Sequence, residues 1–116
     1  MNEAVGAVYR KSFSVNAAAA TEVIAADARG RAIRILAMVL SNNHAANAVV
    51  ATVQDDAGTP LVLIGPMQLV AGNPNVVLPH NPDGWGEGGR GKAIDILLDG
   101  TEVVAGSITY QFVGPA

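Results

Sequence analysis

Short runs of alternating apolar and polar residues recur along the chain, separated by turn-forming residues. This two-residue period is typical of strands that bury one face. In residues 102–113 one face carries Val104, Ile108, Tyr110 and Phe112, and the other carries Ser107, Thr109 and Gln111. The pattern predicts a half-buried strand.

Residues 31–41 form the strongest predicted element. One face of an extended chain carries Ile33, Ile35, Ala37 and Val39, and the other carries Leu36, Met38 and Leu40. A strand that is apolar on both faces is expected to be covered on both.

Turn residues mark the ends of the other predicted strands. Asp55 to Gly58 predicts a hairpin turn closed by the positive φ of its glycine, and Asp99-Gly100 predicts a two-residue hairpin. Gly65-Pro66 is expected to interrupt the strand pattern, and residues 83–91 to form a glycine-rich loop. Residues 16–28 are ambiguous, because their alanines favour a helix and their β-branched residues a strand. We interpret them as a strand.

The expected strands are, in chain order, residues 4–15, 16–28, 31–41, 48–54, 61–64, 67–71, 76–79, 92–98 and 102–113. Many short strands at regular spacing, without a convincing amphipathic helix, are typical of a sandwich or jelly roll. We therefore predict an all-β fold: an antiparallel, jelly-roll-like β-sandwich of about eight strands, in one domain over residues 1–116. Residues 1–16 are expected to form either an extended N-terminal arm that pairs with a neighbouring subunit or an edge strand.

Composition suggests contacts between subunits. The chain has 116 residues, of which 50% are hydrophobic but only 4% aromatic, and alanine and valine supply most of the apolar content. A core with few bulky side chains is thin, so oligomer formation would provide additional burial.

The charge and the residue composition argue against several classes of function for this chain, beginning with nucleic-acid binding. The net charge is −3 and the seven basic residues are scattered, apart from Arg29, Arg31 and Arg34, so nucleic-acid binding is not expected. We interpret these three arginines as solvated charges at a strand entrance, in preference to a small anion site. The absence of cysteine excludes disulfides and thiol chemistry. Residues 1–4 lack a signal-peptide pattern and no apolar run approaches a membrane span, so we expect a soluble protein made in a cytoplasm.

A nucleotide-binding pattern occurs in residues 86–92, which fit G-x-x-x-x-G-K. Its context is wrong for a phosphate-binding loop. Ala93 stands where a serine or threonine hydroxyl would bind magnesium, and the residues that follow alternate as a strand instead of beginning a helix. We therefore interpret the segment as a surface loop.

Other candidate chemical groups have simple structural explanations. His44 and His80 lie in separate loops, and although Asp83 and Glu87 follow His80, we expect solvated side chains and no metal site. Asp55 and Asp56 lack a calcium-loop pattern and are interpreted as turn residues. Asp95 and Asp99, a conceivable glycosidase pair, are explained by a strand face and a hairpin, and Ser107 lies within a strand. We expect no catalytic, cofactor-binding or metal-binding residues.

Trp85 is the one tryptophan of the chain, in a loop among glycines. It is either a plug over the open end of the sandwich or an anchor for a partner, and the plug is the preferred interpretation.

Three segments resemble small virion proteins of tailed bacteriophages: Arg31-Ala32-Ile33-Arg34-Ile35-Leu36, Val77-Leu78-Pro79-His80-Asn81-Pro82-Asp83-Gly84-Trp85 and Gly91-Lys92-Ala93-Ile94-Asp95-Ile96. In that group a "GKRIRVL" strand, a "VLPYNPGGW" turn and a "GEALNL" strand recur. The resemblance covers residues 20–113. Two departures stand out: His80 replaces a common aromatic residue, and the loop after Trp85 is richer in glycine.

This resemblance implies a β-sandwich or jelly roll that serves as a head decoration or cement protein, or as a fibre or knob component. Our first hypothesis is a capsid decoration protein, expected to be a trimer on the virion surface that binds the major capsid protein and stabilises its contacts. The alternative is a fibre, knob or tail component that binds a host surface glycan through Trp85, Asn81 and His80. We expect no cofactor, nucleic acid or membrane partner. The expected partner interface comprises Val8, Tyr9, Arg10, Phe13, His80, Asn81, Pro82 and Trp85.

Overall fold

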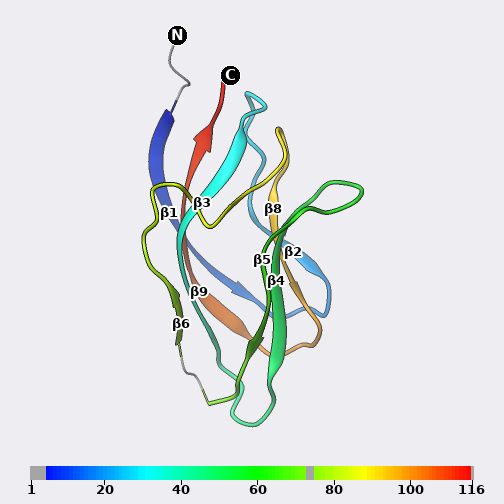
Figure 1. Ribbon diagram of the computed structural model, residues 1–116. Coiled ribbons are helices and arrows are strands. Elements are labelled where there is room, and N and C mark those ends of the chain that lie inside the picture. Colours follow the sequence, from blue (N-terminus) through cyan, green and yellow to red (C-terminus); the bar gives the residue numbers. More distant parts are fainter. Residues whose placement is uncertain (1–4, 73–74, 116) are drawn as a thin grey trace.

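The computed structural model describes residues 5–72 and 75–115, and in this part of the chain nine strands form two antiparallel sheets without any helix (Figure 1). The predicted all-β sandwich is confirmed. The strands are β1 (Val5–Val15), β2 (Ala20–Ile24), β3 (Ala32–Asn42), β4 (Val49–Asp55), β5 (Val62–Leu69), β6 (Asn75–Leu78), β7 (Gly86–Glu87), β8 (Ile94–Leu98) and β9 (Val104–Val113).

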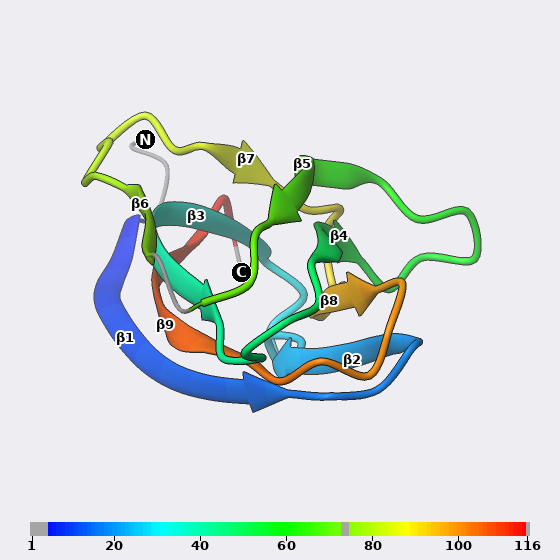
Figure 2. The same cartoon turned by 90° about the horizontal axis from the view of Figure 1, so that it is seen from below.

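The order of the strands is that of a jelly roll. Sheet A has the order β1-β9-β3-β6, with the short β7 also pairing on β3, and sheet B has the order β2-β8-β4-β5. The two sheets face each other around the core (Figure 2). When β7 is set aside, the other eight strands have the pairing expected of a double-sheet jelly roll. The connections β1–β2, β3–β4, β5–β6 and β8–β9 lie at what we call the distal end, and the other end, where β1 begins and β9 finishes, is the terminal end.

β1 lies at the edge of sheet A and pairs with β9, so that Val5 faces Val113 and Val15 faces Val104. Val15 is buried in the core. Of the two alternatives for residues 1–16, the described residues 5–15 therefore form the edge strand, whereas residues 1–4 lie outside the described part. Since β1 contributes to the core, its removal is expected to disturb the fold.

The core between the sheets consists of aliphatic side chains from both inner faces, as the period-two pattern predicts. Val104 and Ile108 of β9 belong to it, and Tyr110 and Phe112 pack against it, which confirms the predicted faces of that strand. The buried core residues are Val15, Val23, Ile24, Ile33, Ile35, Met38, Leu40, Val49, Ala51, Val53, Leu69, Ile94, Ile96, Leu98, Val104 and Ile108.

The predicted faces of residues 31–41 are wrong after Ile35. Ile35 pairs with Tyr110 but Ala37 pairs with Thr109, so Leu36 is the extra residue of a β-bulge. A bulge shifts the alternation by one residue and so moves the following side chains to the opposite faces. The core therefore receives Ile33, Ile35, Met38 and Leu40, whereas Ala37 and Val39 are half-buried on the outer face of sheet A.

The predicted hairpin at Asp99-Gly100 is wrong. β8 belongs to sheet B and β9 to sheet A, so residues 99–103 cross between the sheets. The Asp99 carboxylate accepts a hydrogen bond of 2.8 Å from the backbone N–H of Val50 on β4. This contact ties the crossing to sheet B.

Two further turn predictions need correction. The β4–β5 connection is a hairpin, but it extends over residues 56–61 and Gly58 has no positive φ. Gly65-Pro66 does not end a strand. β5 continues through it with an irregular register, so one strand replaces the two predicted over 61–64 and 67–71.

Gly106 marks a close approach of β9 to β3. It pairs with Leu40 on β3 and with Phe13 on β1. A Cβ atom at this position would overlap the carbonyl oxygen of Val39 and would lie 2.8 Å from the Cα atom of Leu40. Both neighbours are backbone atoms and cannot turn aside, so only glycine fits here.

Candidate functional site

The turn of residues 79–85 is fastened to the bulge of β3. The backbone N–H of Asn81 donates to the carbonyl oxygen of Leu36, and that of Trp85 donates to the carbonyl oxygen of Ile35, each at 2.8 Å. Within the turn, the Asn81 carboxamide oxygen accepts from the N–H of Asp83, and its amide nitrogen donates to the carbonyl oxygen of Gly84. The turn is therefore held both to sheet A and within itself.

Trp85 belongs neither to the hydrophobic core nor to the side chains that pack against it, so the preferred plug interpretation gains no support. Its indole Nε1 donates a 2.8 Å hydrogen bond to the carbonyl oxygen of Pro79, which closes the turn. The side chain is nevertheless 39% exposed. The neighbouring Gly86 lies so close to Leu63 of β5 that an added Cβ would be 2.7 Å from the Leu63 Cβ. The segment thus links the β3 and β5 edges, while part of the indole remains available to a partner.

Replacing Trp85 with alanine is expected to lower the free energy of unfolding by about 2 kcal/mol, because it removes one hydrogen bond and a partly buried ring. Urea titration would measure this loss. Trp85→Phe is the matched control, since it keeps an aromatic ring but removes the N–H donor. An unchanged stability in Trp85→Ala would show that the indole does not fasten the turn.

The glycine-rich loop after Trp85 uses its amides inside the fold. The N–H groups of Gly88 and Gly91 donate to the carbonyl oxygens of Ile33 and Arg31, and that of Lys92 donates back to Gly89. The N–H of Gly89 donates to the Asp55 carboxylate at 3.0 Å. The loop that fits the phosphate-binding pattern is therefore organised around a carboxylate of the protein itself.

Asp55 is a buried structural residue, which the interpretation as a simple turn residue missed. Its side chain is 2% exposed. Oδ1 accepts from the N–H groups of Leu61 and Ala57 at 2.8 and 3.2 Å, and Oδ2 accepts from Gly89. Burial opposes the charged form, but the hydrogen bonds from Leu61, Gly89 and Ala57, helped by Lys92, lower the pKa of Asp55. One carboxylate thus holds the 56–61 and 88–92 loops together.

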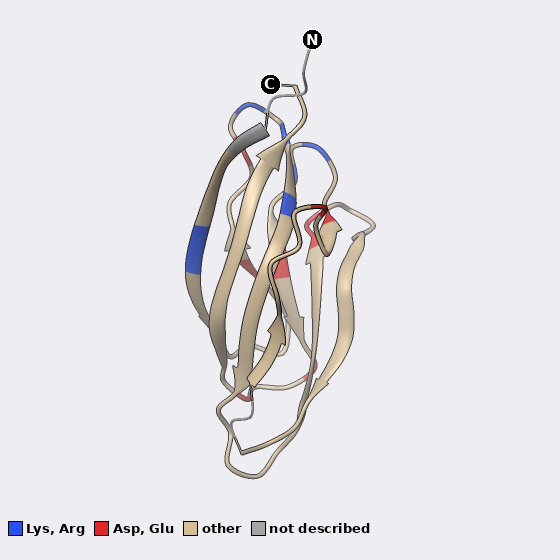
Figure 3. Cartoon of the chain, turned by 60° about the vertical axis from the view of Figure 1, so that its left-hand side comes forward, with Lys and Arg blue, Asp and Glu red and all other residues tan. Residues whose placement is uncertain are grey.

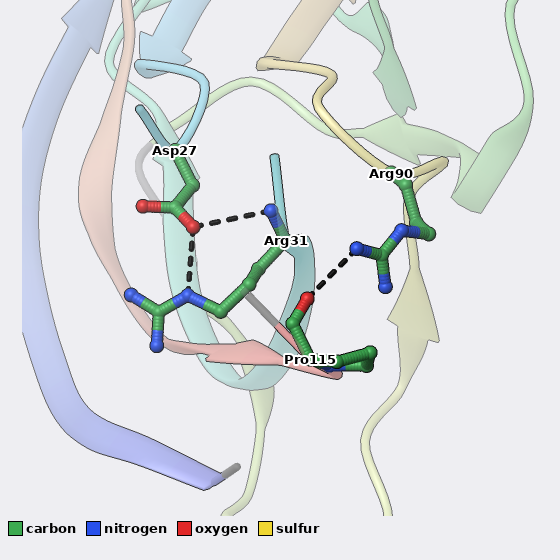
Figure 4. A network of polar contacts seen from close by, with 4 residues as sticks. All are labelled: Asp27, Arg31, Arg90 and Pro115. Atoms are coloured by element: carbon green, nitrogen blue, oxygen red, sulfur yellow. Dashed lines mark hydrogen bonds and ion pairs between the residues drawn. The ribbon is translucent and has the colours of Figure 1, made fainter. Parts of the chain in front are cut away.

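Two of the three arginines near residue 30 are engaged in ion pairs, so the prediction of solvated charges is wrong for them. Arg31 Nε lies 2.7 Å from the Asp27 carboxylate, and Arg34 Nε lies 3.1 Å from that of Glu87. Arg31 also lies over the Phe112 ring, 5.2 Å from its centroid. Figure 4 shows the Asp27 contact beside a second link at the terminal end, where Arg90 donates to the carbonyl oxygen of Pro115 at 2.7 Å.

At the distal end, Asn42 is a buried structural residue that joins loops, as Asp55 does for the 56–61 and 88–92 loops. It is fully buried, and its amide nitrogen donates to the carbonyl oxygens of Asn47 and Leu69 at 2.7 and 3.1 Å. Its oxygen accepts from the N–H of His44, whose Nδ1 in turn accepts from the N–H groups of Ala46 and Asn47. His44 is therefore engaged in its own loop.

The eight predicted interface residues lie at two opposite edges of sheet A. On β1, Val8 and Tyr9 are 55% and 46% exposed, and Arg10 is also exposed, while Phe13 is half-buried against the core. At the other edge, beyond β9 and β3, lies the 79–85 turn, with His80 and Pro82 exposed and Asn81 half-buried. The structure thus divides the predicted interface into two patches.

Tyr9 belongs to an aromatic cluster on the inner face of sheet A. Its ring stacks on that of Tyr110 with centroids 5.6 Å apart, and Phe112 lies 5.8 Å from Tyr9 and 5.7 Å from Tyr110. Because Tyr9 sits on an edge strand, the cluster reaches solvent. The β1 edge therefore has an exposed aromatic side chain, Tyr9, that packs against Tyr110 and Phe112 of β9.

The described residues contain no group of three or more histidine or acidic side chains placed to hold a metal ion. Nor does any helix long and apolar enough to cross a membrane occur in residues 5–72 and 75–115. Asp95 and Asp99 lie at different places, on the outer face of β8 and in the crossing to β9.

Comparisons with known proteins found no matching protein family, no matching curated protein and no matching solved structure.

Proposed function

We propose that this protein is a decoration protein of a tailed-bacteriophage head, which binds the outer surface of the shell as a trimer and ties neighbouring major capsid subunits together. It would act by burying surface between itself and the capsid subunits, without any chemical reaction. Each contact can be modest, because a trimer that engages several coat subunits gains avidity through a high effective concentration.

One observation carries the proposal: the consecutive residues Val8 and Tyr9 have about half-exposed side chains on an edge strand whose backbone is paired with β9 and whose Val15 is buried in the core. Isolated exposed apolar residues are ordinary, but Val8 on the outer face and Tyr9 on the inner face flank the free edge of a well-supported strand. An aliphatic and an aromatic side chain on the two sides of this edge offer an anchor to a partner that approaches it. In contrast, the polar groups of the loop that fits a nucleotide-binding pattern are used within the fold.

The contacts of the resembling segments also support the proposal. Residues 31–36 include the bulge of β3, and residues 77–85 include the turn that binds this bulge through the carbonyl oxygens of Ile35 and Leu36. These two segments, far apart in sequence, form one structural unit. Their joint recurrence in phage virion proteins has a physical reason, since each stabilises the other.

The first test is quantitative mass spectrometry of purified virions. A copy number of this chain comparable with that of the major capsid protein is the expected result. A few copies per particle would instead indicate a fibre or tail component, and absence from the particle would overturn the virion proposal.

The anchor role of the β1 edge can be tested with Val8→Ser, which we expect to weaken binding to capsids that lack this protein by about tenfold. Its matched control is Leu61→Ser, which removes a similarly exposed aliphatic side chain from the 56–61 loop. Both variants should keep the thermal stability of the parent. Equal capsid binding by the two variants would argue against the β1 edge as the contact.

A second candidate function is glycan binding at the 79–85 turn, because the indole of Trp85 is partly exposed beside the exposed His80. Aromatic stacking is a common way to hold a sugar ring. Asn81 is less suitable than the sequence suggested, since its carboxamide already bonds within the turn. A His80→Ala variant with parental stability that no longer bound host cells would favour this second function.

A further inference from the structure

Three polar side chains form a row on the outer face of sheet B. The register places Glu22 of β2 opposite Asp95 of β8, and Asp95 opposite Gln54 of β4. Val53 and Ile96, the chain neighbours of Gln54 and Asp95, are fully buried in the core, so the two polar side chains project to the opposite side. Glu22 shares this outer face because cross-strand partners project to the same side. Sheet B thus brings together two carboxylates and one carboxamide from three strands.

The two carboxylates of this row are not neutralised by a basic residue of sheet B. Like charges directly opposite each other on neighbouring strands repel, and β2, β8, β4 and β5 contain no lysine or arginine. In Figure 3 the basic segments lie on β1 and toward the terminal end. Burial raises the pKa of Asp95, and the charges of Asp56, Glu22 and Asp55 raise it further. A bound cation would relieve the repulsion.

Gln54 provides a second, independent indication of a ligand. The residue is only 8% exposed, yet its carboxamide makes no hydrogen bond with another group of the described residues. None of the buried side-chain nitrogen or oxygen atoms in this part of the chain lacks a partner, so the amide of Gln54 must reach the surface beside Asp95. An amide that is nearly withdrawn from water and unpaired within the chain has a free oxygen for a ligand at the acidic pair.

The lengths of the three side chains suit one cation above the middle of the row. Asp95, in the centre, is shorter by one methylene group than Glu22 and Gln54 on either side of it. Cross-strand neighbours have Cβ atoms about 4.5–5.5 Å apart. The two longer side chains can therefore reach an ion above Asp95 from both sides.

The donor atoms of the row select the kind of cation. The row contains no histidine and the chain no cysteine, so its ligands are oxygen atoms alone, which suit Ca²⁺ and Mg²⁺ better than Zn²⁺ or Cu²⁺. Ca²⁺ accepts oxygen ligands in flexible geometry and completes its shell with water, whereas Mg²⁺ demands a near-ideal octahedron. Three oxygens whose positions follow from strand register therefore favour Ca²⁺. The set is not a group of three acidic or histidine side chains, of which the described residues contain none, because its third oxygen belongs to an amide.

We propose that Glu22, Asp95 and Gln54 form a Ca²⁺ site on the outer face of sheet B, in which both carboxylates and the amide oxygen bind the ion. Because the ligands come from β2, β8 and β4, the ion would link three strands and stabilise the folded subunit. The sequence analysis expected no metal-binding residue and weighed Asp95 only with Asp99, since strand pairing is not visible within a single segment. The inference concerns the single subunit and would stand if the capsid proposal failed.

Calorimetric titration of the purified full chain with CaCl₂ tests the site. We expect saturable binding with a Kd of about 1 mM, because only two of the ligands are charged. CaCl₂ at about ten times the Kd should then raise the folding equilibrium constant, measured by urea titration, about tenfold. NaCl at the same ionic strength should not have this effect. The absence of saturable binding at millimolar Ca²⁺ would overturn the proposal, and so would an equal stabilisation by NaCl.

A neutral variant tests the two carboxylates. Glu22→Gln with Asp95→Asn keeps the size of both side chains but removes their charges, so it should abolish saturable Ca²⁺ binding. Without Ca²⁺ it should raise the melting temperature, because the repulsion is gone. Asp83→Asn with Glu102→Gln is the matched control, since it removes the same two charge types from connections outside sheet B, and it should keep the parental Kd. A parental Kd in the Glu22 and Asp95 variant would contradict the site.

Two variants of Gln54 test the amide separately. Gln54→Glu supplies a third carboxylate of the same length, so it should tighten Ca²⁺ binding at least about threefold and destabilise the Ca²⁺-free chain. Gln54→Leu has no oxygen to offer and should weaken Ca²⁺ binding at least about threefold. If Gln54→Glu failed to fold in the absence of Ca²⁺, the Kd of Gln54→Leu would decide. A parental Kd in Gln54→Leu would exclude the amide and overturn the three-ligand site.

Discussion

Gly106→Ala is expected to destabilise the fold by about 3 kcal/mol or more, a large part of the stability of a domain of this size. The added Cβ atom would collide with the carbonyl oxygen of Val39 and press on the Cα atom of Leu40. These atoms belong to β3, which is paired with β9 on one side and with β6 and β7 on the other. Relief would therefore require two central strands of sheet A to separate.

Chemical denaturation with urea, followed by far-UV circular dichroism, would measure this loss. Gly58→Ala is the matched control, because an added Cβ at Gly58 meets no atom within 4 Å and the residue has no positive φ. The control should be neutral or slightly stabilising, since alanine reduces the freedom of the unfolded chain. If both variants unfolded at the parental urea concentration, the close approach of β9 to β3 would be wrong.

Asp55→Asn is expected to lower the free energy of unfolding by about 3 kcal/mol. The asparagine keeps one acceptor oxygen for Leu61 and Ala57, but its amide nitrogen would face the N–H of Gly89, which is also a donor. The charge that strengthens all three hydrogen bonds is lost as well. Asp83→Asn, in an exposed turn, is the control and should change stability by less than about 0.5 kcal/mol.

The same residue predicts a pH dependence with a definite sign. The pKa of Asp55 is lower in the folded chain than its ordinary value of 3.8, so the folded state binds the proton less readily than the unfolded state. Its contribution is therefore fully present above that value and is lost as the pH falls below it. Urea titrations from pH 7 to pH 3 should show the difference between the parent and Asp55→Asn shrinking toward the acid end. A constant difference would show that the Asp55 charge is unimportant.

The period-two pattern was sufficient to predict the fold class. Each strand buries one face, so the alternation in β9 is visible within that strand alone, and β2 is recognisable from its own β-branched residues. The faces of β3 were predicted wrongly, since the bulge at Leu36 is determined by pairing with β9 and leaves no mark in the local pattern. The same limit explains Asp99-Gly100. A hairpin and a crossing between sheets use the same turn residues, and the contact with Val50 that distinguishes them comes from another strand.

The candidate surfaces were predictable only where they lie within one segment. The sequence analysis named Val8, Tyr9 and Trp85 as expected contact residues, and the structure finds the side chains of all three partly exposed. Asp55 was missed because its partners Leu61 and Gly89 come from two loops that the fold brings together. The Glu22–Asp95 pair was missed for the same reason, since the strand pairing that joins β2 to β8 cannot be read from either strand alone.

The pairing of β1 with β9 has a consequence for how the protein folds. Of the nine described strands β1 is synthesised first, yet its neighbour in sheet A, β9, is synthesised last. Until β9 is available, the edge of sheet A lacks its neighbour and Val15 has no opposing Val104. Closure of such distant contacts is slow, because much chain entropy is lost before they form. Sheet A is therefore completed only after β9 has been made, and the surface formed by β1 becomes available to partners only once all nine described strands exist.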